Sequence, residues 1–226
     1  MVGKINLEQP LSGPKFFNYN IEDYAFVEEI SKCLKCDNLS EAHKVYSSDF
    51  DILTFETDQS TIFHKTFYSM PKDSKFYTIY DSFIRNEIQN LFDEEIIYQR
   101  IPTFRAQVPN NLGVAEWHKD KQYNHSSREV NIYLPLTDAY GTSTVWSETQ
   151  EGLGDYTPLN ATSGEYYVWS GANWNHGNKK NKTGKTRISI DFRIMPISKY
   201  KDNHRTSTSN STKMTIGHYW AKLNKE

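Results

Sequence analysis

The sequence predicts a mainly β domain, a barrel with flanking helices, and so an α+β protein in the broad sense. From Ile97 onward, short segments alternate apolar and polar side chains, as strands with one buried face do. Two stretches in the first hundred residues instead space their apolar side chains as amphipathic helices do. His118 and His176 lie far apart in the chain, which suits a barrel whose later strand returns beside an earlier one.

Two helices are expected before the barrel. Apolar side chains at helical spacing predict a helix over residues 21–35, with Asn20 as its N-cap. The same spacing predicts a longer helix over residues 73–92, with Asp73 or Ser74 as its cap. Each helix has one apolar stripe to bury, so we expect both to pack on the outside of the barrel.

Strands are expected in the remaining segments. Residues 44–69 resemble strands interrupted by Asp and Ser turns. Farther on, Arg105 and Gln107 alternate with apolar residues, and Asn131 and Tyr133 do the same in the next segment. The polar face of such a barrel strand points either into the cavity or out to solvent. For Asn131 and Tyr133 we favour the cavity.

The chain is long enough for one domain with a substantial core, and we expect residues 1–226 to form a single unit. Residues 1–96 would be a helical and mixed N-terminal support, and residues 97–197 the β core. Residues 198–226 begin with a polar stretch that we expect to be mobile. Their aromatic end would fold back as a wall or lid over the cavity.

The bulk composition limits the class of partner. A net charge of −2 and a pI near 6.4 give no electrostatic reason to expect nucleic acid or an anionic membrane. No apolar run reaches membrane-spanning length, and the first residues contain no continuous apolar segment. We therefore expect a cytoplasmic protein with a small-molecule partner, and the oligomeric state stays open.

Two histidines and one carboxylate suggest a metal site. His118 and Asp120 are two residues apart, so on a strand both side chains would leave the same face and could share one metal. His176 is the candidate for the third ligand. This donor set is the facial triad that mononuclear Fe(II) oxygenases use.

An arginine and a serine follow the last candidate ligand. Arg187 and Ser189 lie on a segment whose polar residues, up to Arg193, alternate with Ile188, Ile190, Phe192 and Ile194. A fixed guanidinium can hold a carboxylate through two hydrogen bonds, and the Ser189 hydroxyl can add another. The segment therefore suggests a carboxylate anchor beside the metal.

These residues resemble a known family. His118-Lys-Asp120, His176 and Arg187-Ile-Ser189, with the text around them, resemble the Fe(II)/2-oxoglutarate-dependent oxygenases. Within that superfamily they are similar to the streptomycin-biosynthesis oxygenase-like branch, which is related to phytanoyl-CoA hydroxylase. The match covers about residues 100–197. It implies a double-stranded β-helix, also called a jelly-roll or cupin-like barrel.

The resemblance also implies an activity. The protein would be a dioxygenase of the EC 1.14.11 type with Fe(II), 2-oxoglutarate and O2, oxidising an unactivated C–H bond and releasing succinate and CO2. His118, Asp120 and His176 would hold the iron, and Arg187 would hold the far carboxylate of 2-oxoglutarate. The other candidate contacts to 2-oxoglutarate are Ser189, Asn131, Tyr133 and Gln107, and the candidate substrate contacts are Arg105, Glu116, His125, Trp146 and Arg193.

Three other interpretations stay open. A nucleic-acid dealkylase would share the iron chemistry, but the chain has no basic patch interleaved with aromatic residues. A peptide or protein hydroxylase is compatible with everything above. A cupin-like protein that binds metal without catalysis is less compatible, because the triad and Arg187 are both intact. The resemblance favours a small polar metabolite, such as a sugar, a cyclitol or an amino-acid derivative.

Overall fold

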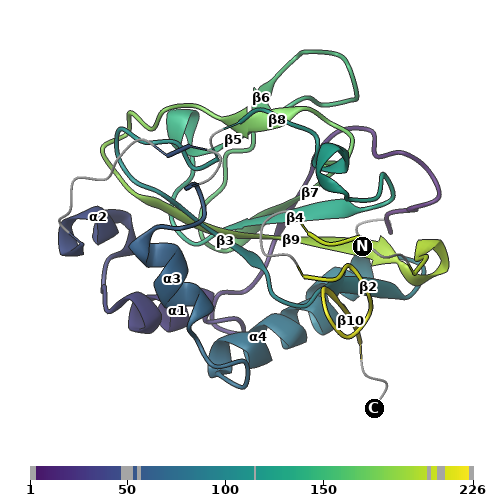
Figure 1. Ribbon diagram of the computed structural model, residues 1–226, viewed down its shortest axis with the longest axis horizontal. Coiled ribbons are helices and arrows are strands. Elements are labelled where there is room, and N and C mark those ends of the chain that lie inside the picture. The colour runs from purple at the N-terminus through teal and green to yellow at the C-terminus, as the bar shows by residue number, and fades with distance from the viewer. Residues whose placement is uncertain are drawn as a thin grey trace.

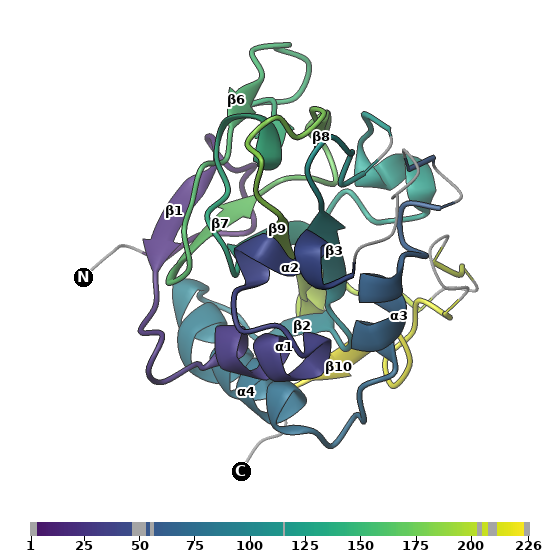
Figure 2. The same cartoon turned by 90° about the vertical axis from the view of Figure 1, so that its left-hand side faces the viewer.

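The computed structural model describes residues 4–46, 53–54, 57–114, 116–202, 205–207 and 212–223. They form three layers, with helices below, a large sheet in the middle and a small sheet above (Figure 1). The view turned by 90° shows the same order of layers (Figure 2). The chain is therefore mainly β, with its α-helices on one side of the large sheet.

The large sheet is antiparallel, and its longest strand is β9. The strand order is β1-β7-β4-β9-β2-β10, and β3 also pairs with β9. The bounds are β1 Lys15–Asn18, β2 Ile96–Gln99, β3 Thr103–Gln107, β4 Val130–Pro135, β7 Glu165–Trp169, β9 Arg187–Pro196 and β10 Trp220–Lys222. β9 is thus hydrogen-bonded to β4 on one side and to β2 and β3 on the other.

The small sheet has the order β6-β5-β8 and lies over the large one (Figure 1). Its bounds are β5 Val145–Ser147, β6 Thr157–Pro158 and β8 His176–Asn178. An isolated bridge joins His118 to His176 through two backbone hydrogen bonds of 2.9 Å. The expected jelly-roll arrangement is present as two facing sheets, but the described strands do not close into a barrel.

The helices cover the far face of the large sheet. Their bounds are α1 Phe26–Leu34, α2 Ala42–Val45, α3 Ile62–Tyr68 and α4 Lys75–Phe83, and a π-helical turn (Ile84–Ile88) and a 3₁₀ turn (Gln89–Leu91) extend α4. The helix expected over residues 73–92 is confirmed, with Ser74 at its N-cap position. The other short 3₁₀ helices are Leu39–Glu41, η4 (Asp120–Tyr123), η5 (Gly141–Ser143) and Ile197–Lys199.

Two local predictions are wrong. The first helix begins at Phe26 and not at residue 21, because the Asn20 side chain accepts from the Glu22 backbone in a separate turn. Strands were expected in residues 44–69, but residues 62–68 form α3, and Val45 ends α2. Part of that stretch, residues 47–52 and 55–56, lies outside the described residues.

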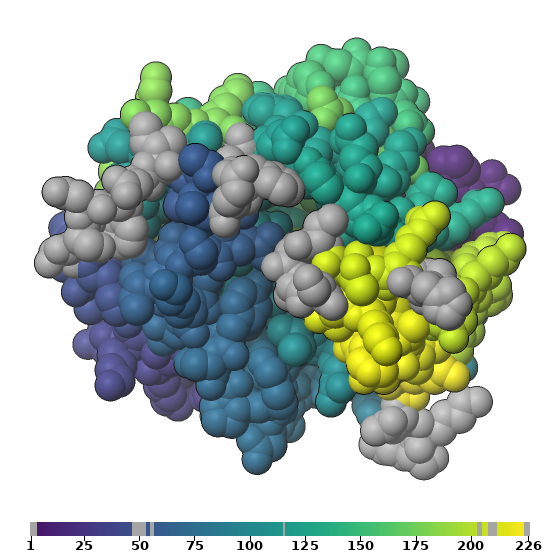
Figure 3. Space-filling model, in the orientation of Figure 1, coloured from purple at the N-terminus to yellow at the C-terminus, as the bar shows by residue number. Residues whose placement is uncertain are grey.

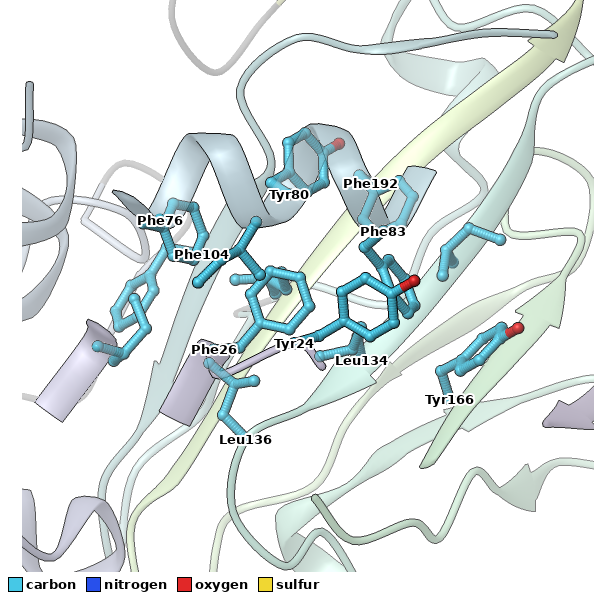
Figure 4. Close-up of a cluster of buried hydrophobic side chains, with 14 of the residues drawn as sticks. Tyr24, Phe26, Phe76, Tyr80, Phe83, Phe104, Leu134, Leu136, Tyr166 and Phe192 are labelled. Carbon is cyan, nitrogen blue, oxygen red and sulfur yellow. The ribbon is translucent and has the colours of Figure 1, made fainter. Parts of the chain in front are cut away.

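The main hydrophobic core lies between the helices and the large sheet (Figure 4). From β9, Ile188, Ile190, Phe192 and Ile194 point into it, and none of them is exposed. Phe192 packs edge-on against Tyr80 of α4, with 5.1 Å between the ring centroids. The opposite face of the same strand carries the polar residues, so it turns toward the small sheet.

The described end of the C-terminal segment adds a strand to the large sheet. Trp220–Lys222 pairs with β2, and Tyr219 and Trp220 pack with Ile97 and Met195. In Figure 3 this segment, in yellow, covers part of the face that also presents the blue helices. Of the polar stretch expected to be mobile, residues 203–204 and 208–211 lie outside the described residues. None of the described helices has the length and apolarity needed to span a membrane.

Candidate active site

Three candidate metal ligands meet between the two sheets. One ligand atom each from His118, Asp120 and His176 lies within 4.8 Å of the other two. Asp120 Oδ1 is 3.3 Å from Nε2 of His118 and 3.6 Å from Nε2 of His176. Ligands on adjacent corners of an octahedron are separated by roughly 3 Å when the metal distances are about 2.1 Å. The donor atoms are therefore already spaced for one shared ion.

Different local structures position the three side chains. His118 lies on the isolated bridge to β8, and Asp120 is the first residue of η4. The expectation that both lie on one strand is therefore wrong, although they still face the same point. His176 begins β8, and Trp117 packs over Gly177, where an added Cβ would come within 2.5 Å of the indole.

Both histidines are held in the orientation that frees Nε2. Nδ1 of His118 lies 3.0 Å from the Glu116 carbonyl, and Nδ1 of His176 lies 3.0 Å from the Trp174 carbonyl. A carbonyl can only accept, so each Nδ1 carries the proton and each Nε2 has its lone pair available. Burial and the neighbouring His118 lower the pKa of His176 to about 4, which keeps it neutral at ordinary pH.

Asp120 is fixed through one carboxylate oxygen, which leaves the other free. Its Oδ2 accepts from Arg193 Nε at 2.9 Å and Nη2 at 2.8 Å, and from Asn131 Nδ2 at 2.8 Å. Burial alone would raise the pKa of Asp120, but Arg193, His118 and His176 outweigh it and hold that pKa well below its ordinary value. Asp120 is therefore an anion whose Oδ1 points at the two imidazoles.

Arg187 lies in the same cavity and is almost completely buried, at 1% exposed. It donates to the Ser143 carbonyl at 3.0 Å, to Ser189 Oγ at 2.7 Å and to Gln107 Oε1 at 3.1 Å. All three acceptors are neutral, and no carboxylate of the described residues forms an ion pair with it. Burial lowers the pKa of Arg187, but a guanidinium stays charged in proteins. A buried cation without an anion is costly, so this position suits a carboxylate.

A row of alternating charges forms the cavity floor beside Arg187. Arg105 Nε donates to Asp191 Oδ1 at 3.2 Å. Asp191 Oδ2 is 3.8 Å from Arg193 Nη1, and Arg193 binds Asp120 as described. The β3–β9 and β4–β9 registers place Thr103 and Tyr133 beside Asp191, so the row crosses the middle of the large sheet.

Both sheets contribute to the cavity wall. The lining residues are Arg105, Val114, His118, Asp120, Asn131, Tyr133, Val145, Trp169, His176, Gly177, Asn178, Arg187, Asp191 and Arg193. Several buried polar atoms in this wall have no hydrogen-bond partner: Arg105 Nη1, Asn131 Oδ1, Tyr133 Oη and Trp169 Nε1. Such atoms cost about 1–3 kcal/mol each unless water or a ligand satisfies them. The wall is therefore suited to a polar ligand.

The sequence-based candidates fall into three groups. Arg105, Asn131, Tyr133, Arg187 and Arg193 line the cavity. Ser189 and Gln107 do not line it, but both hold the Arg187 guanidinium.

Three candidate substrate contacts lie outside the cavity wall. His125 is buried against Glu129, with 2.7 Å between Nδ1 and Oε2. Trp146 faces Lys179, whose Nζ is 3.1 Å from the ring centroid. The Glu116 side chain accepts from the Tyr123 hydroxyl at 2.7 Å. None of the three lines the cavity in the described part of the chain.

Among the lining residues that sequence reasoning missed, Asp191 and Trp169 stand beside charged or metal-ligating groups. Asp191 shares the alternation of Arg187 and Arg193, so its orientation could have been read from the same pattern. Trp169 stands opposite Asn131 in the β4–β7 register, and its ring meets His176 edge-on at 4.7 Å. Only the strand pairing shows this, because nothing in the sequence near Trp169 points to the metal.

Comparisons with known proteins identify a relative of this chain. The chain is 38% identical to the streptomycin biosynthesis protein StrG of Streptomyces griseus over 172 residues, which are 75% of this chain and 80% of StrG. No protein-family model matches the chain. This identity and coverage are sufficient to place the two proteins in one family.

Solved structures show the same fold at low sequence identity. HygX from Streptomyces hygroscopicus, with nickel and 2-oxoglutarate bound, is 9% identical with a TM-score of 0.50, covering 87% of this chain and 88% of HygX. EctD from S. alaskensis, with bound iron, is 13% identical with a TM-score of 0.50, covering 83% of this chain and 74% of EctD. The chain therefore belongs to the same family as StrG, the streptomycin-biosynthesis branch that its motifs resemble, and it has the fold of the Fe(II)/2-oxoglutarate-dependent oxygenases.

Proposed function

We propose that this protein is an Fe(II)/2-oxoglutarate-dependent dioxygenase that oxidises an unactivated C–H bond of a small polar metabolite and releases succinate and CO2. One observation carries the proposal. A buried arginine that forms no ion pair with any carboxylate of the described residues, Arg187, lies in the same cavity as the cluster of His118, Asp120 and His176. A protein that only bound metal would have no use for that cation.

The donor set fits Fe(II). Two neutral imidazoles and one carboxylate would occupy one face of an octahedron and leave three positions for other ligands. When bound, iron with 2-oxoglutarate supplies the oxygen chemistry, and the protein supplies binding, orientation and the exclusion of water. Asp120 is oriented to bind the metal through Oδ1, because Arg193 and Asn131 hold its other oxygen, Oδ2.

The polar groups of the cavity wall also suit 2-oxoglutarate. Arg187 offers a fork of donors for the far carboxylate, and Ser189 and Gln107 hold the guanidinium in place. The hydroxyl of Tyr133, near Arg187, and the amide of Asn131, on Asp120, add polar groups to the wall. The Tyr133 hydroxyl lies near Thr144 and Ser189 without a regular hydrogen bond to either, so it is available to a ligand.

The polar wall and the relationship to StrG support a small polar substrate, such as a sugar, a cyclitol or an amino-acid derivative. A peptide hydroxylase is the alternative enzyme, and a non-catalytic metal-binding protein is the alternative of another class. Both alternatives can be separated from the proposal by experiment. A peptide substrate would stimulate succinate release where no small metabolite does, and an inert protein would bind Fe(II) without releasing succinate.

The test is an anaerobic titration of the Fe(II)-loaded protein with 2-oxoglutarate, followed by the visible metal-to-ligand band. Arg187→Ala should weaken binding by about 2–5 kcal/mol, which is roughly 30-fold to several thousand-fold. Arg187→Lys keeps the charge without the fork, so it should lose less. His176→Ala should abolish succinate formation while its circular dichroism stays native. Parental affinity for 2-oxoglutarate in Arg187→Ala would refute the anchor.

A further inference from the structure

Arg105 has a donor that the rest of the site does not use. Its Nε is paired with Asp191 Oδ1 at 3.2 Å, but its Nη1 is buried and has no hydrogen-bond partner among the residues that the structure describes. The side chain lines the cavity and is 12% exposed. A guanidinium donor left in this state costs free energy unless a ligand or water accepts from it.

The other two arginines of the cavity are already engaged. Arg193 directs Nε and Nη2 to Asp120, and its Nη1 is 3.3 Å from Gln99 Oε1. Arg187 is the anchor for the far carboxylate of 2-oxoglutarate in the proposed function. Arg105 is thus the cavity arginine with a donor left over for a further ligand.

The charge of the loaded site points to the kind of ligand. The lining holds three arginines and two aspartates, so with neutral histidines its net charge is 3 − 2 = +1. Fe(II) adds two positive charges and 2-oxoglutarate two negative ones, so this excess remains when both are bound. Arg187 is then matched by the far carboxylate, and Asp120 is in ion-pair contact with Arg193. Among the described residues, Asp191 is the carboxylate in ion-pair contact with Arg105, and it also lies 3.8 Å from Arg193.

We propose that Arg105 forms a subsite for an anionic oxygen group, a phosphate or a carboxylate, on the primary substrate. The inference rests on the proposed function, because the excess charge is counted with iron and 2-oxoglutarate in place. Arg105 pairs across the β3–β9 register with Ser189, the neighbour of the Arg187 anchor. A substrate anion bound there would lie beside the co-substrate and would neutralise the cavity.

A neutral hydroxyl fits the subsite less well. It could accept from Nη1, but it would leave the positive charge uncompensated in a site from which water is excluded. Asp58 attracts Arg105 from farther away and does not line the cavity, so it does not replace an anion at Nη1. The geometry of a guanidinium also favours phosphate and carboxylate, both of which can accept two parallel hydrogen bonds.

The experiment uses the full chain loaded with Ni(II) and saturating 2-oxoglutarate, with inorganic phosphate as the first probe. Paramagnetic Ni(II) enhances the ³¹P relaxation of phosphate bound near it, and the effect falls steeply with distance. Acetate, followed through its methyl protons, is the second probe and separates a carboxylate site from a phosphate site. Zn(II)-loaded protein gives the diamagnetic baseline.

Three variants locate the bound anion. Arg105→Gln should reduce the metal-dependent enhancement at least ten-fold for the preferred probe, and Arg105→Lys should retain part of it. Arg128→Gln is the matched control, because Arg128 is exposed and lines a separate basic groove with Lys121, Lys199, Lys201 and Arg205. The control should leave the enhancement unchanged. The 2-oxoglutarate affinity of Arg105→Gln should stay within about two-fold of the parent.

Four results would overturn the inference: no enhancement with either probe, equal enhancement in Arg105→Gln, loss of the effect in Arg128→Gln, or a large loss of 2-oxoglutarate affinity in Arg105→Gln. The last would place Arg105 in the co-substrate site. These outcomes differ from a failure of the proposed function, in which the parent protein itself would not bind 2-oxoglutarate in the presence of metal.

Discussion

The two faces of β9 are chemically opposite, and both are buried except at half-buried Asp191. Ile188, Ile190, Phe192 and Ile194 face the helices, whereas Arg187, Ser189, Asp191 and Arg193 face the small sheet. On the helix side each side chain packs against apolar neighbours. It stabilises the fold because its apolar surface is removed from water. On the cavity side most of the buried groups are charged. Arginines and aspartates pair with one another there, and Arg105 Nη1 has no acceptor among the described residues.

This difference separates stability from binding along a single strand. The helix side stabilises the sheet and needs no ligand. The cavity side contains buried arginines, and protein groups offset only part of the free energy that their desolvation costs. Bound anions would offset the rest, and the histidines and Asp120 are placed to bind a metal. Substitutions on the first face should therefore change the free energy of unfolding, and substitutions on the second should mainly change ligand affinity.

The largest stability effect is expected on the helix side. Phe192→Ala removes a fully buried ring that packs against Tyr80, and should lower the free energy of unfolding by about 3–5 kcal/mol. Urea unfolding followed by circular dichroism measures this. At a temperature where the variant is folded, its affinity for 2-oxoglutarate should match the parent's.

Ser189→Ala is the matched variant on the other face of the same strand. It removes one hydrogen bond to Arg187 and should change stability much less than Phe192→Ala while weakening 2-oxoglutarate binding. Equal loss of stability in the two variants would refute the division between the faces.

A histidine on the helix side should make stability depend on pH. His64 is fully buried in α3 against Phe104, and burial lowers its pKa from the ordinary 6.5 to about 3. Between these values the unfolded chain takes up a proton that the folded chain does not. Stability should therefore fall as the pH is lowered from 6.5, by about 1.4 kcal/mol per unit from this residue.

His64→Leu should remove the part of the pH dependence of the free energy of unfolding that His64 contributes. The measurement is the free energy of unfolding at pH 7, 6 and 5 for both proteins. An unchanged slope in the variant would show that His64 is not the group responsible.

Much of the cavity side could be predicted because strand alternation is a local pattern. In the segments around Asn131 and Arg187, alternation assigns the polar residues to the face that the structure turns toward the cavity, because successive side chains on a strand point to opposite faces. For Arg105 the same pattern left open whether its face meets the cavity or solvent. The helix over residues 75–91 was predictable for a similar reason, since its apolar residues recur at helical spacing.

The failures come from contacts that are distant in sequence. Residues 62–68 are rich in strand-forming side chains, but they form α3, where Phe67 stacks on Phe104 at 4.7 Å. The hydrogen bonds from Arg193 to Asp120 join residues 73 positions apart. No local pattern distinguishes an arginine that binds substrate from one that orients a metal ligand.

The next prediction concerns the hydrogen bonds between Arg193 and Asp120 on the cavity side. Arg193→Gln leaves the outer oxygen of Asp120 with the Asn131 amide as its remaining described donor, so the carboxylate loses its fixed orientation. Groups that orient a metal ligand typically contribute 10–100-fold to metal affinity. We expect a loss of about that size in Ni(II) titration calorimetry, with Arg193→Lys between the variant and the parent and Arg128→Gln unaffected. Parental affinity in Arg193→Gln would contradict this role.

The smallest expected effect is on 2-oxoglutarate affinity, and it tests how tightly the cavity side packs around Arg187. Gly113 packs against Arg187, and an added Cβ would lie 2.4 Å from Arg187 Nη2. The guanidinium cannot move away freely, because Ser143, Ser189 and Gln107 all hold it. Gly113→Ala should therefore displace the anchor and weaken 2-oxoglutarate binding by about 1–2 kcal/mol, near the lower end of overpacking costs. The metal affinity should not change, because the triad lies elsewhere in the cavity. If 2-oxoglutarate binds to Gly113→Ala as tightly as to the parent, the anchor has more room than the packing around Gly113 indicates.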